Sequence, residues 1–173
     1  MIRMSVDLET LGTQPNSLVL AIGLAAICDT RGLIDSKVIY PSRKEQKFRR
    51  IDPDTVDWWM GQTREAQRLA FVPEDSQLTI EAAMRSLMGF WQDRGCEEVW
   101  GHGPTMDVSI LEDLAFDFEL HVPWNFRQVR CLRTLAMLAP EVQKVKPWVP
   151  HSAQHDAIAQ GIWAKEMVQW LKK

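Results

Sequence analysis

The longest apolar run of the chain, residues 18–28, is the feature that most constrains its fold. The run is far shorter than the roughly 20 apolar residues of a membrane-spanning helix, and Gly23 interrupts it. Turn-forming residues bound the run and β-branched residues occur within it, which is typical of a strand buried in a sheet. We therefore expect a buried strand over residues 17–28.

Two further strands are expected beside this one. Residues 2–7 precede a turn-rich connection at residues 12–17, and residues 33–40 alternate between apolar and polar side chains. The link at residues 29–32 suits a hairpin. The sequence therefore predicts that the chain opens with three antiparallel strands.

The remainder of the chain shows helical patterns separated by short strands. Pro53 follows Asp52, a good N-cap, and begins a helical region that extends to residue 70. Residues 79–94 carry a helical apolar stripe that ends at Gly95. Further elements are expected at residues 97–101 (strand), 106–118 (helix), 129–138 (strand end leading into a helix) and 153–171 (helix). This order predicts an α/β fold with a mixed sheet of about five strands, the first three antiparallel, flanked by helices in a single domain of residues 1–173.

The composition is that of a globular protein. The 173 residues include 46% hydrophobic and 25% charged side chains, which suits one domain of ordinary size. The three cysteines form no C-x-x-C pair, so we expect reduced thiols in a cytoplasmic protein. Acidic residues interrupt the apolar stretch at the N-terminus, which argues against a signal peptide, and no membrane contact is expected.

Two carboxylates lie at the end of the first predicted strand. Asp7 and Glu9, in S-V-D-L-E-T-L-G, are two residues apart and therefore project from the same face of a strand. Side by side they would repel each other unless a cation neutralised them. A D-x-E pair at a strand end is common, so the pair alone is weak evidence for a site.

More candidates follow later in the chain. Asp107 comes after the turn G-H-G-P, where it could ligate a metal or simply serve a helix N-terminus. Glycines on both sides of His102 allow a ligand to approach the backbone closely. Asp156 falls in the first turns of the last helix, and His151 lies in the preceding loop, as a base, a cap or an exposed loop residue. His155 competes as the base, but on a helix it would point elsewhere.

Four carboxylates and one histidine together suit the hydrolysis of phosphodiesters. Oxygen ligands favour two Mg²⁺ or Mn²⁺ ions, and an imidazole can take a proton from water. The formal net charge is −3, which two divalent ions would bring to about +1. Because a strong basic surface is absent, we expect a short contact with nucleic acid rather than a long groove.

The order D-x-E, D and H-x(4)-D resembles that of the DEDDh 3′→5′ exonucleases, which have a ribonuclease H-like fold. The resemblance extends to the exodeoxyribonuclease VIII-like branch of phages and prophages. The similar segments, which span almost the whole chain, are S-V-D-L-E-T-L-G, I-D-P-D-T-V-D-W-W-M-G-Q-T-R-E-A, V-W-G-H-G-P-T-M-D, V-R-C-L-R-T-L and H-S-A-Q-H-D-A-I-A-Q.

This resemblance implies specific roles at the matching positions. The metal ligands would be Asp7, Glu9, Asp107 and Asp156, and His151 would be the general base. Two Mg²⁺ or Mn²⁺ ions would bind, and 5′-nucleoside monophosphates would leave one at a time from the 3′ end of DNA or RNA, either single-stranded or as an overhang.

The resemblance also implies contacts with the terminal nucleotide. Leu11 would wedge an apolar side chain against the base, and Thr10 would supply backbone donors. Met106 stands where relatives commonly carry phenylalanine. The remaining candidates for substrate contact are His102 and Trp59.

The adjacent residues Trp58 and Trp59 cannot face the same way on a helix. We expect one of them in the core and the other against a base or in a homodimer interface. Two other functions compete with the exonuclease: a nucleic-acid-binding module that has lost catalysis, and a two-metal phosphodiesterase of dinucleotides or short oligonucleotides. The sequence leaves RNA and DNA both open as substrates.

Overall fold

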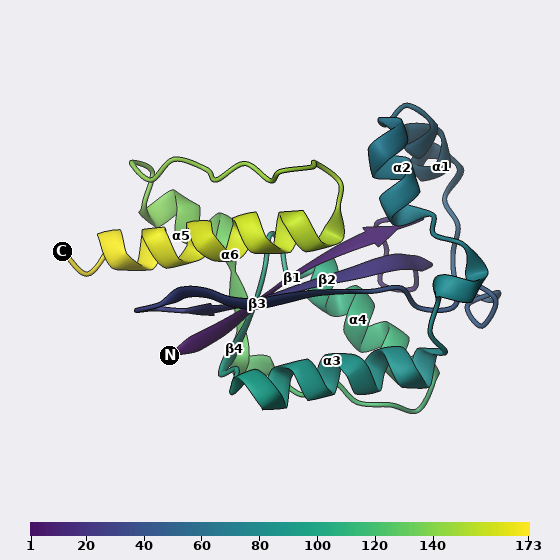
Figure 1. The fold of residues 1–173 in the computed structure, drawn as a ribbon, viewed down its shortest axis with the longest axis horizontal. Coiled ribbons are helices and arrows are strands. Elements are labelled where there is room, and N and C mark those ends of the chain that lie inside the picture. Colours follow the sequence, from purple (N-terminus) through teal and green to yellow (C-terminus); the bar gives the residue numbers. More distant parts are fainter.

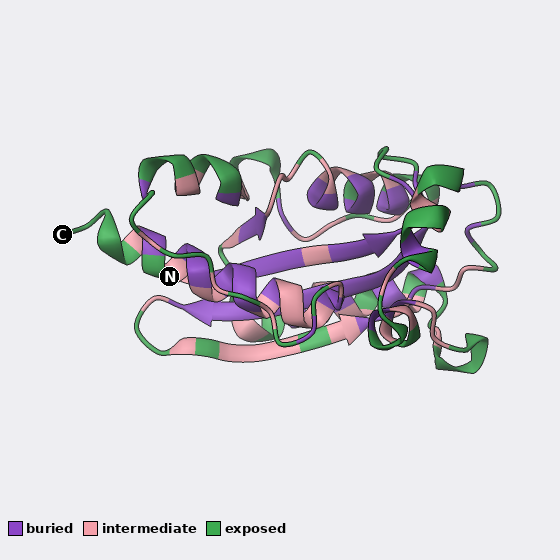
Figure 2. Ribbon diagram, turned by 90° about the horizontal axis from the view of Figure 1, so that it is seen from above, coloured by how far each residue is buried: buried purple, intermediate pink, exposed green.

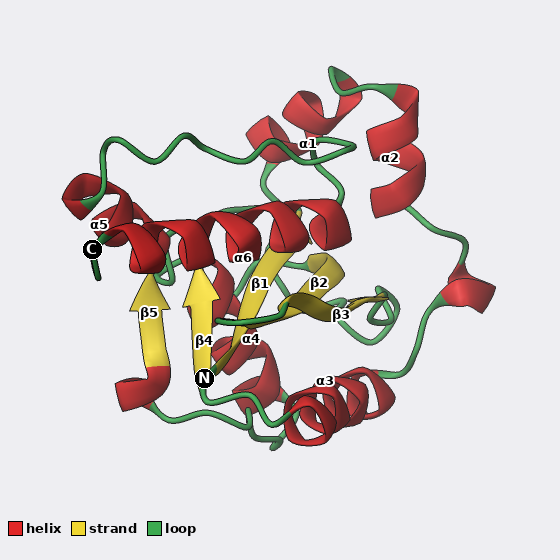
Figure 3. Ribbon diagram, turned by 60° about the vertical axis from the view of Figure 1, so that its left-hand side comes forward, coloured by secondary structure: helices red, strands yellow, loops and turns green.

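The computed structural model describes residues 1–173, which form a five-stranded sheet flanked by helices (Figures 1 and 3). The strands lie in the order β3-β2-β1-β4-β5, so β1 is central. Strands β1, β2 and β3 are antiparallel neighbours, whereas β4 runs parallel to β1 and β5 runs parallel to β4. The bounds are β1 Ile2–Thr10, β2 Val19–Cys28, β3 Gly32–Ile39, β4 Glu98–Gly101 and β5 Val129–Cys131. The expected mixed α/β sheet is confirmed.

Helices cover both faces of this sheet. In Figure 1, α5 and α6 lie on one side, and α3 and α4 lie on the other. The pair α1 and α2 lies at the edge toward which β1 points. The bounds are α1 Pro53–Met60, α2 Arg64–Ala70, α3 Ile80–Arg94, α4 Asp107–Asp117, α5 Leu132–Leu138 and α6 Ala153–Trp170, with short 3₁₀ turns at Glu74–Ser76 and Phe126–Gln128. None of these helices combines the length and apolar content needed to cross a membrane.

The strand pattern explains why the sheet is central. Every residue of β2 is buried, as the apolar run predicts, and Figure 2 shows the buried strands in the middle of the molecule. Along β1, alternate residues Met4, Val6 and Leu8 belong to the main core, which also contains residues of α3 and α4. The intervening positions, which include Asp7 and Glu9, therefore project from the opposite face, toward α6.

Helix α6 packs unusually close to this second face. A Cβ on Gly23 would lie 1.9 Å from the carbonyl oxygen of Ala153, and a Cβ on Gly161 would lie 2.6 Å from Cγ1 of Ile27. Gly23 is also the register partner of Asp7 on β1. The glycine therefore lets the first turn of α6 descend onto the sheet beside Asp7.

The structure differs from the predictions at the end of β1, in the helical region after Asp52 and at the N-cap of α1. Strand β1 continues to Thr10, beyond the expected residue 7, because the ladder with β2 persists through a register shift between Glu9 and Thr10. The helical region after Asp52 is split into α1 and α2, and Thr63 caps α2 by accepting a hydrogen bond from the Ala66 N–H. Asp52 occupies the N-cap of α1, but its side chain makes no capping hydrogen bond.

Candidate active site

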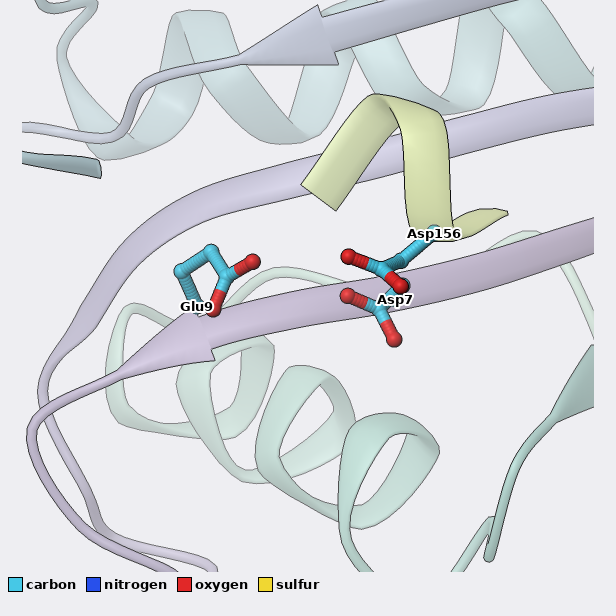
Figure 4. Close-up of side chains that lie close together, drawn as sticks. All are labelled: Asp7, Glu9 and Asp156. Carbon is cyan, nitrogen blue, oxygen red and sulfur yellow. The ribbon is translucent and has the colours of Figure 1, made fainter. Parts of the chain in front are cut away.

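Three carboxylates from the two ends of the chain meet at the carboxyl end of β1. Asp7 and Glu9 come from β1, and Asp156 comes from the first turn of α6 (Figure 4). Their nearest ligand atoms lie within 4.8 Å of one another. Such a group can hold a metal ion through oxygen atoms alone, which is the donor set that Mg²⁺ and Mn²⁺ prefer.

Asp107 and His151 border the same cavity as this group. Asp107 is the first residue of α4 and is buried, and its Oδ1 accepts a hydrogen bond of 3.3 Å from the Leu8 N–H. His151 has a backbone φ of 60°, in the left-handed region that residues other than glycine rarely adopt. The structure therefore brings all five predicted residues to one cavity, although Asp107 lies outside the compact group of three carboxylates.

Hydrogen bonds orient two of the clustered carboxylates. Gln160 Nε2 donates to Asp7 Oδ1 at 2.6 Å, and the Ser152 N–H donates to Asp156 Oδ2 at 3.1 Å. Gln160 lies four residues after Asp156 on α6, so both side chains project from the same face of the helix. A helix that supplies one carboxylate thus also fixes the orientation of another.

Burial and mutual repulsion disfavour the ionised forms of these carboxyl groups. Burial, followed by the charges of Asp107, Glu9 and Asp156, raises the pKa of Asp7 well above its usual range. Burial, followed by the charges of Asp156 and Asp107, raises the pKa of Glu9 to about 8. Burial raises the pKa of Asp107 to about 6, although the Leu8 N–H opposes the shift. Burial also raises the pKa of Asp156, against the Ser152 N–H and the charge of His151.

The residues present fit divalent cations. Oε1 of Glu9 is buried and has no hydrogen-bond partner within the protein. A buried carboxylate oxygen without a partner is costly unless a cation or water satisfies it. Nearby positive charge would also remove the repulsion that raises the pKa values of the carboxyl groups. Asp7, Glu9, Asp107 and Asp156 therefore have the chemistry of metal ligands.

The cavity around the carboxylates has a volume of about 680 Å³. This size lies within the usual range for small-molecule and cofactor sites. Its walls carry opposite charges at different places: Arg133 and Lys144 are cationic, whereas Asp52 and Asp54 are acidic. Of the predicted substrate-contact residues, those that line the cavity are Thr10, Trp59, His102 and Met106.

Two of the residues expected to contact the substrate, Leu11 and Trp59, are buried. Leu11 is only 8% exposed and packs in a small core with Trp59, so its side chain does not wedge into the cavity. Trp59 is 1% exposed, and its Nε1 donates to the Thr10 carbonyl oxygen at 2.9 Å. Trp58 is 45% exposed and lies edge-on to the His151 ring at 4.8 Å between centroids. Trp58, rather than Trp59, thus presents a ring that a base could contact.

Sequence reasoning missed Gln160 as a residue of this site. Gln160 is identifiable only by its spacing of four residues from Asp156 on the final helix. The sequence left open which tryptophan of the pair faces the core, because α1 is short and its apolar stripe is ambiguous. Thr10 borders the cavity, and its Oγ1 donates to the Gly12 carbonyl oxygen at 2.6 Å.

Comparisons with known proteins identify the family and the fold of this chain. A family model described as "3'-5' exoribonuclease Rv2179c-like domain" matches residues 2–171. The chain is also similar in structure to the nuclease domain of 3′hExo, described as a DEDDh family member bound to rAMP. That similarity has a TM-score of 0.64 at 15% identity and covers 97% of this chain and 92% of that domain.

Two larger nucleases share the fold. A zinc-bound complex of E. coli ExoI with single-stranded DNA gives a TM-score of 0.63 at 15% identity, covering 99% of this chain but 40% of that protein. Cell-death related nuclease 4 (CRN-4) gives a TM-score of 0.55 at 11% identity, covering 98% of this chain and 64% of that protein. The chain thus spans well under half the length of ExoI. No curated protein sequence matches it.

Proposed function

Because the chain belongs to the family of 3′-5′ exoribonuclease Rv2179c-like domains, we propose that it is a divalent-metal-dependent 3′→5′ exonuclease acting on single-stranded RNA. The observation that carries the proposal is the convergence of Asp7, Glu9 and Asp156 within 4.8 Å, with Asp107 and His151 on the same cavity. We assign residues 1–173 to one catalytic domain, in keeping with the extent of the family match.

The four carboxylates would hold two Mg²⁺ or Mn²⁺ ions. When bound, such ions lower the pKa of an attacking water and stabilise charge on the leaving oxygen. The protein contributes the orientation of the ligands, because Gln160 fixes one oxygen of Asp7 and the Ser152 N–H fixes one oxygen of Asp156. These hydrogen bonds keep the ligands from reorganising as charge develops during cleavage.

His151 is suited to accept the proton of the attacking water. Its ring borders the cavity and packs edge-on against Trp58, while its left-handed backbone directs it from the loop before α6. An imidazole nitrogen with a free lone pair can accept a proton and can therefore act as a base. We assign it as the general base, with Trp58 limiting the orientations of its ring.

RNA is the first substrate to test because the family description names an exoribonuclease and 3′hExo is described as bound to rAMP. E. coli ExoI, by contrast, is described in complex with single-stranded DNA. The narrower resemblance to the exodeoxyribonuclease VIII-like branch favours DNA and stays a prediction. A direct comparison of the two substrates decides between them.

The test uses 5′-labelled single strands of RNA and DNA with the same sequence. Each is incubated with the protein and Mn²⁺ or Mg²⁺, or with EDTA, and resolved on a denaturing gel. We expect a metal-dependent ladder that shortens from the 3′ end, with RNA cut faster. Release of the labelled 5′ nucleotide without a ladder, or cleavage that persists in EDTA, would contradict the proposal.

Variants identify the residues that carry the activity. Asp7→Asn and Asp156→Asn should each lower the cleavage rate at least about a thousandfold, because each removes a metal-ligand charge. Asp57→Asn is the matched control, since Asp57 is an exposed aspartate of α1 that does not line the cavity. It should change the rate less than about threefold. Full activity of either ligand variant would remove that residue from the metal site.

A second substrate class, dinucleotides and short oligonucleotides, is favoured by the net charge of −3 and by the acidic wall of the cavity. A longer strand carries more phosphates, but a protein with this charge attracts them only weakly. Strands of two to ten nucleotides distinguish the classes. The cleavage rate of a dinucleotide enzyme falls sharply as the strand lengthens. The cleavage rate of the proposed exonuclease stays the same or rises.

The homodimer also stays a prediction. Helix α1 carries the exposed Trp58 and Met60, which are 45% and 62% exposed and could form such an interface. Light scattering during size-exclusion chromatography measures the molar mass directly. A mass near 19.9 kDa at all concentrations would exclude a stable dimer.

A further inference from the structure

The cavity has a cationic side whose charges are not used by the protein itself. Arg133 comes from the first turn of α5, and Lys144 comes from the segment that joins α5 to α6. Neither forms an ion pair, although neighbouring Arg130 pairs with Glu98 at 2.8 Å. Both side chains are exposed and border the carboxylate cavity. Free cations beside a phosphodiester-cleaving site are available to bind phosphate.

Both cations are close enough to act on the residues of the site. Burial lowers the pKa of His102, and the charges of Lys144 and Arg133 lower it further. Arg133 also favours the ionised form of Asp107, and Lys144 that of Asp156. The two cations therefore flank the carboxylates without neutralising them through direct contact.

The backbone shape brings Arg133 to the cavity wall. Gly103 has a φ of 113°, and a Cβ at that position would lie 3.5 Å from Nε of Arg133. The guanidinium thus lies over the G-H-G turn that precedes Asp107. A larger residue at position 103 would be strained by this backbone conformation.

Opposite charge comes from a different element that lines the cavity. Asp52 and Asp54 line it near the start of α1. Figures 1 and 3 place α1 and α5 near opposite ends of α6. A strand has phosphates only upstream of its scissile bond, because the 3′-terminal nucleoside ends in a hydroxyl. Repulsion by the acidic end and attraction by the cationic end therefore favour one direction of binding.

We propose that Arg133 and Lys144 bind the backbone phosphates upstream of the scissile bond, so that the strand leaves the cavity toward α5 and the 3′-terminal nucleoside lies toward α1. This inference rests on the proposed exonuclease function. It gives the enzyme a preference for strands over mononucleotide esters, because only strands carry upstream phosphates. It also explains how a chain of net charge −3 can hold nucleic acid locally.

The test pairs charge removal in the protein with charge removal in the strand. The probe is a 5′-fluorescein hexauridylate in which one of the three upstream linkages nearest the scissile bond is a neutral methylphosphonate. The sugar on the 5′ side of that linkage is deoxyribose in the probe and in its phosphate parent, which prevents self-cleavage. Affinities are measured by fluorescence anisotropy with Ca²⁺, so that binding is read without turnover.

The variants are Arg133→Gln and Lys144→Gln, with Lys146→Gln as the matched control. Lys146 is an exposed lysine on the same segment that does not line the cavity. For the wild type and the control, at least one neutral linkage should weaken binding about fivefold. For Arg133→Gln or Lys144→Gln the same linkage should have almost no effect. In each of these variants the negative slope of log affinity against log salt concentration should become shallower by about 0.7.

The outcomes separate this inference from the proposed function. Equal losses in the variants and the wild type at all three linkages would overturn the roles of Arg133 and Lys144, even if the enzyme cleaves RNA from the 3′ end. Conversely, the expected coupling in the binding assay, together with no cleavage of the parent strand in Mn²⁺ or Mg²⁺, would uphold the phosphate contacts and overturn the exonuclease. A loss of affinity by Lys146→Gln equal to that by Lys144→Gln would mean that general charge, rather than the cavity wall, attracts the strand.

Discussion

Gln160 on α6 donates a 2.6 Å hydrogen bond to Asp7 on β1, across 153 residues of sequence. The contact joins the two elements that supply the clustered carboxylates. We expect Gln160→Met to weaken Mn²⁺ binding about 10- to 100-fold, because residues that orient metal ligands commonly have effects of this size. Calorimetric titration with Mn²⁺ measures the affinity directly.

Gln154→Met is the matched control for this prediction. Gln154 lies on the same helix but donates to Ser36 Oγ at 2.9 Å, away from the carboxylates. It should retain the metal affinity of the wild type. Unchanged Mn²⁺ affinity in Gln160→Met would show that the hydrogen bond to Asp7 does not position this ligand.

Gly23→Ala should damage both stability and activity. The new Cβ would meet the Ala153 carbonyl at 1.9 Å, and because this is backbone, the first turn of α6 must move away from β2. Overpacking of this kind costs about 1–3 kcal/mol. Urea unfolding measures the stability, and Mn²⁺ titration reports whether Asp156 has moved with the helix.

Gly89→Ala provides the opposite expectation. A Cβ on Gly89 of α3 would meet nothing within 4 Å. Replacing a glycine inside a helix by alanine should therefore stabilise the fold by about 0.5–1 kcal/mol and leave metal binding unchanged. Equal effects of the two substitutions would contradict the close approach of α6 to Gly23.

The raised pKa of Glu9 predicts a pH-dependent stability of the metal-free protein. Its pKa is about 8 in the folded state, against 4.5 for an unperturbed glutamate. Between these values the unfolded chain releases the proton while the folded protein retains it, so ionisation favours unfolding as pH rises. In EDTA, the melting temperature of Glu9→Gln should therefore exceed that of the wild type by a margin that grows from pH 5 to pH 8.

Divalent metal should reverse this difference. With Mn²⁺ at saturating concentration, the ionised carboxylate of Glu9 binds the metal ion, and the wild type becomes the more stable protein. Differential scanning fluorimetry at several pH values, with and without Mn²⁺, measures both effects. A margin independent of pH in EDTA would mean that Glu9 does not titrate in this range.

The two adjacent tryptophans should separate substrate binding from stability. Trp58→Ala should raise KM for RNA, since base–aromatic stacking contributes about 1–3 kcal/mol, and should leave the unfolding free energy nearly unchanged. Trp59→Ala should lower the unfolding free energy by about 3–5 kcal/mol, because it empties a buried core position. Steady-state kinetics and urea unfolding on both variants give the comparison. Similar profiles for both variants would contradict the different exposures of the two rings.

Much of the fold follows from local sequence patterns. The apolar run that becomes β2 is buried throughout, and Gly95 ends α3 in the left-handed conformation, as its position predicts. The pairing of Asp7 with Glu9 on one face follows from the alternation of a strand. These features depend on residues that are close in the chain, so they can be predicted from the sequence.

Features that depend on distant partners were not predictable. Leu11 has an apolar side chain that suits either a base or a core, and only the packing against Trp59 assigns it to the core. Likewise, Arg133 was indistinguishable in sequence from any solvated surface cation. Its place beside the cavity arises because β5 directs α5 past the Gly103 turn, which no spacing of residues reveals.

The arrangement of the carboxylates has a consequence for the order of events during protein synthesis. Asp7 and Glu9 leave the ribosome first, whereas His151 and Asp156 emerge only after every strand of the sheet has been made. A nascent chain that stops before residue 151 lacks part of the site, whatever it has already folded. Cleaving ability would therefore arise last, so the messenger and transfer RNAs beside an unfinished chain would not meet an assembled nuclease.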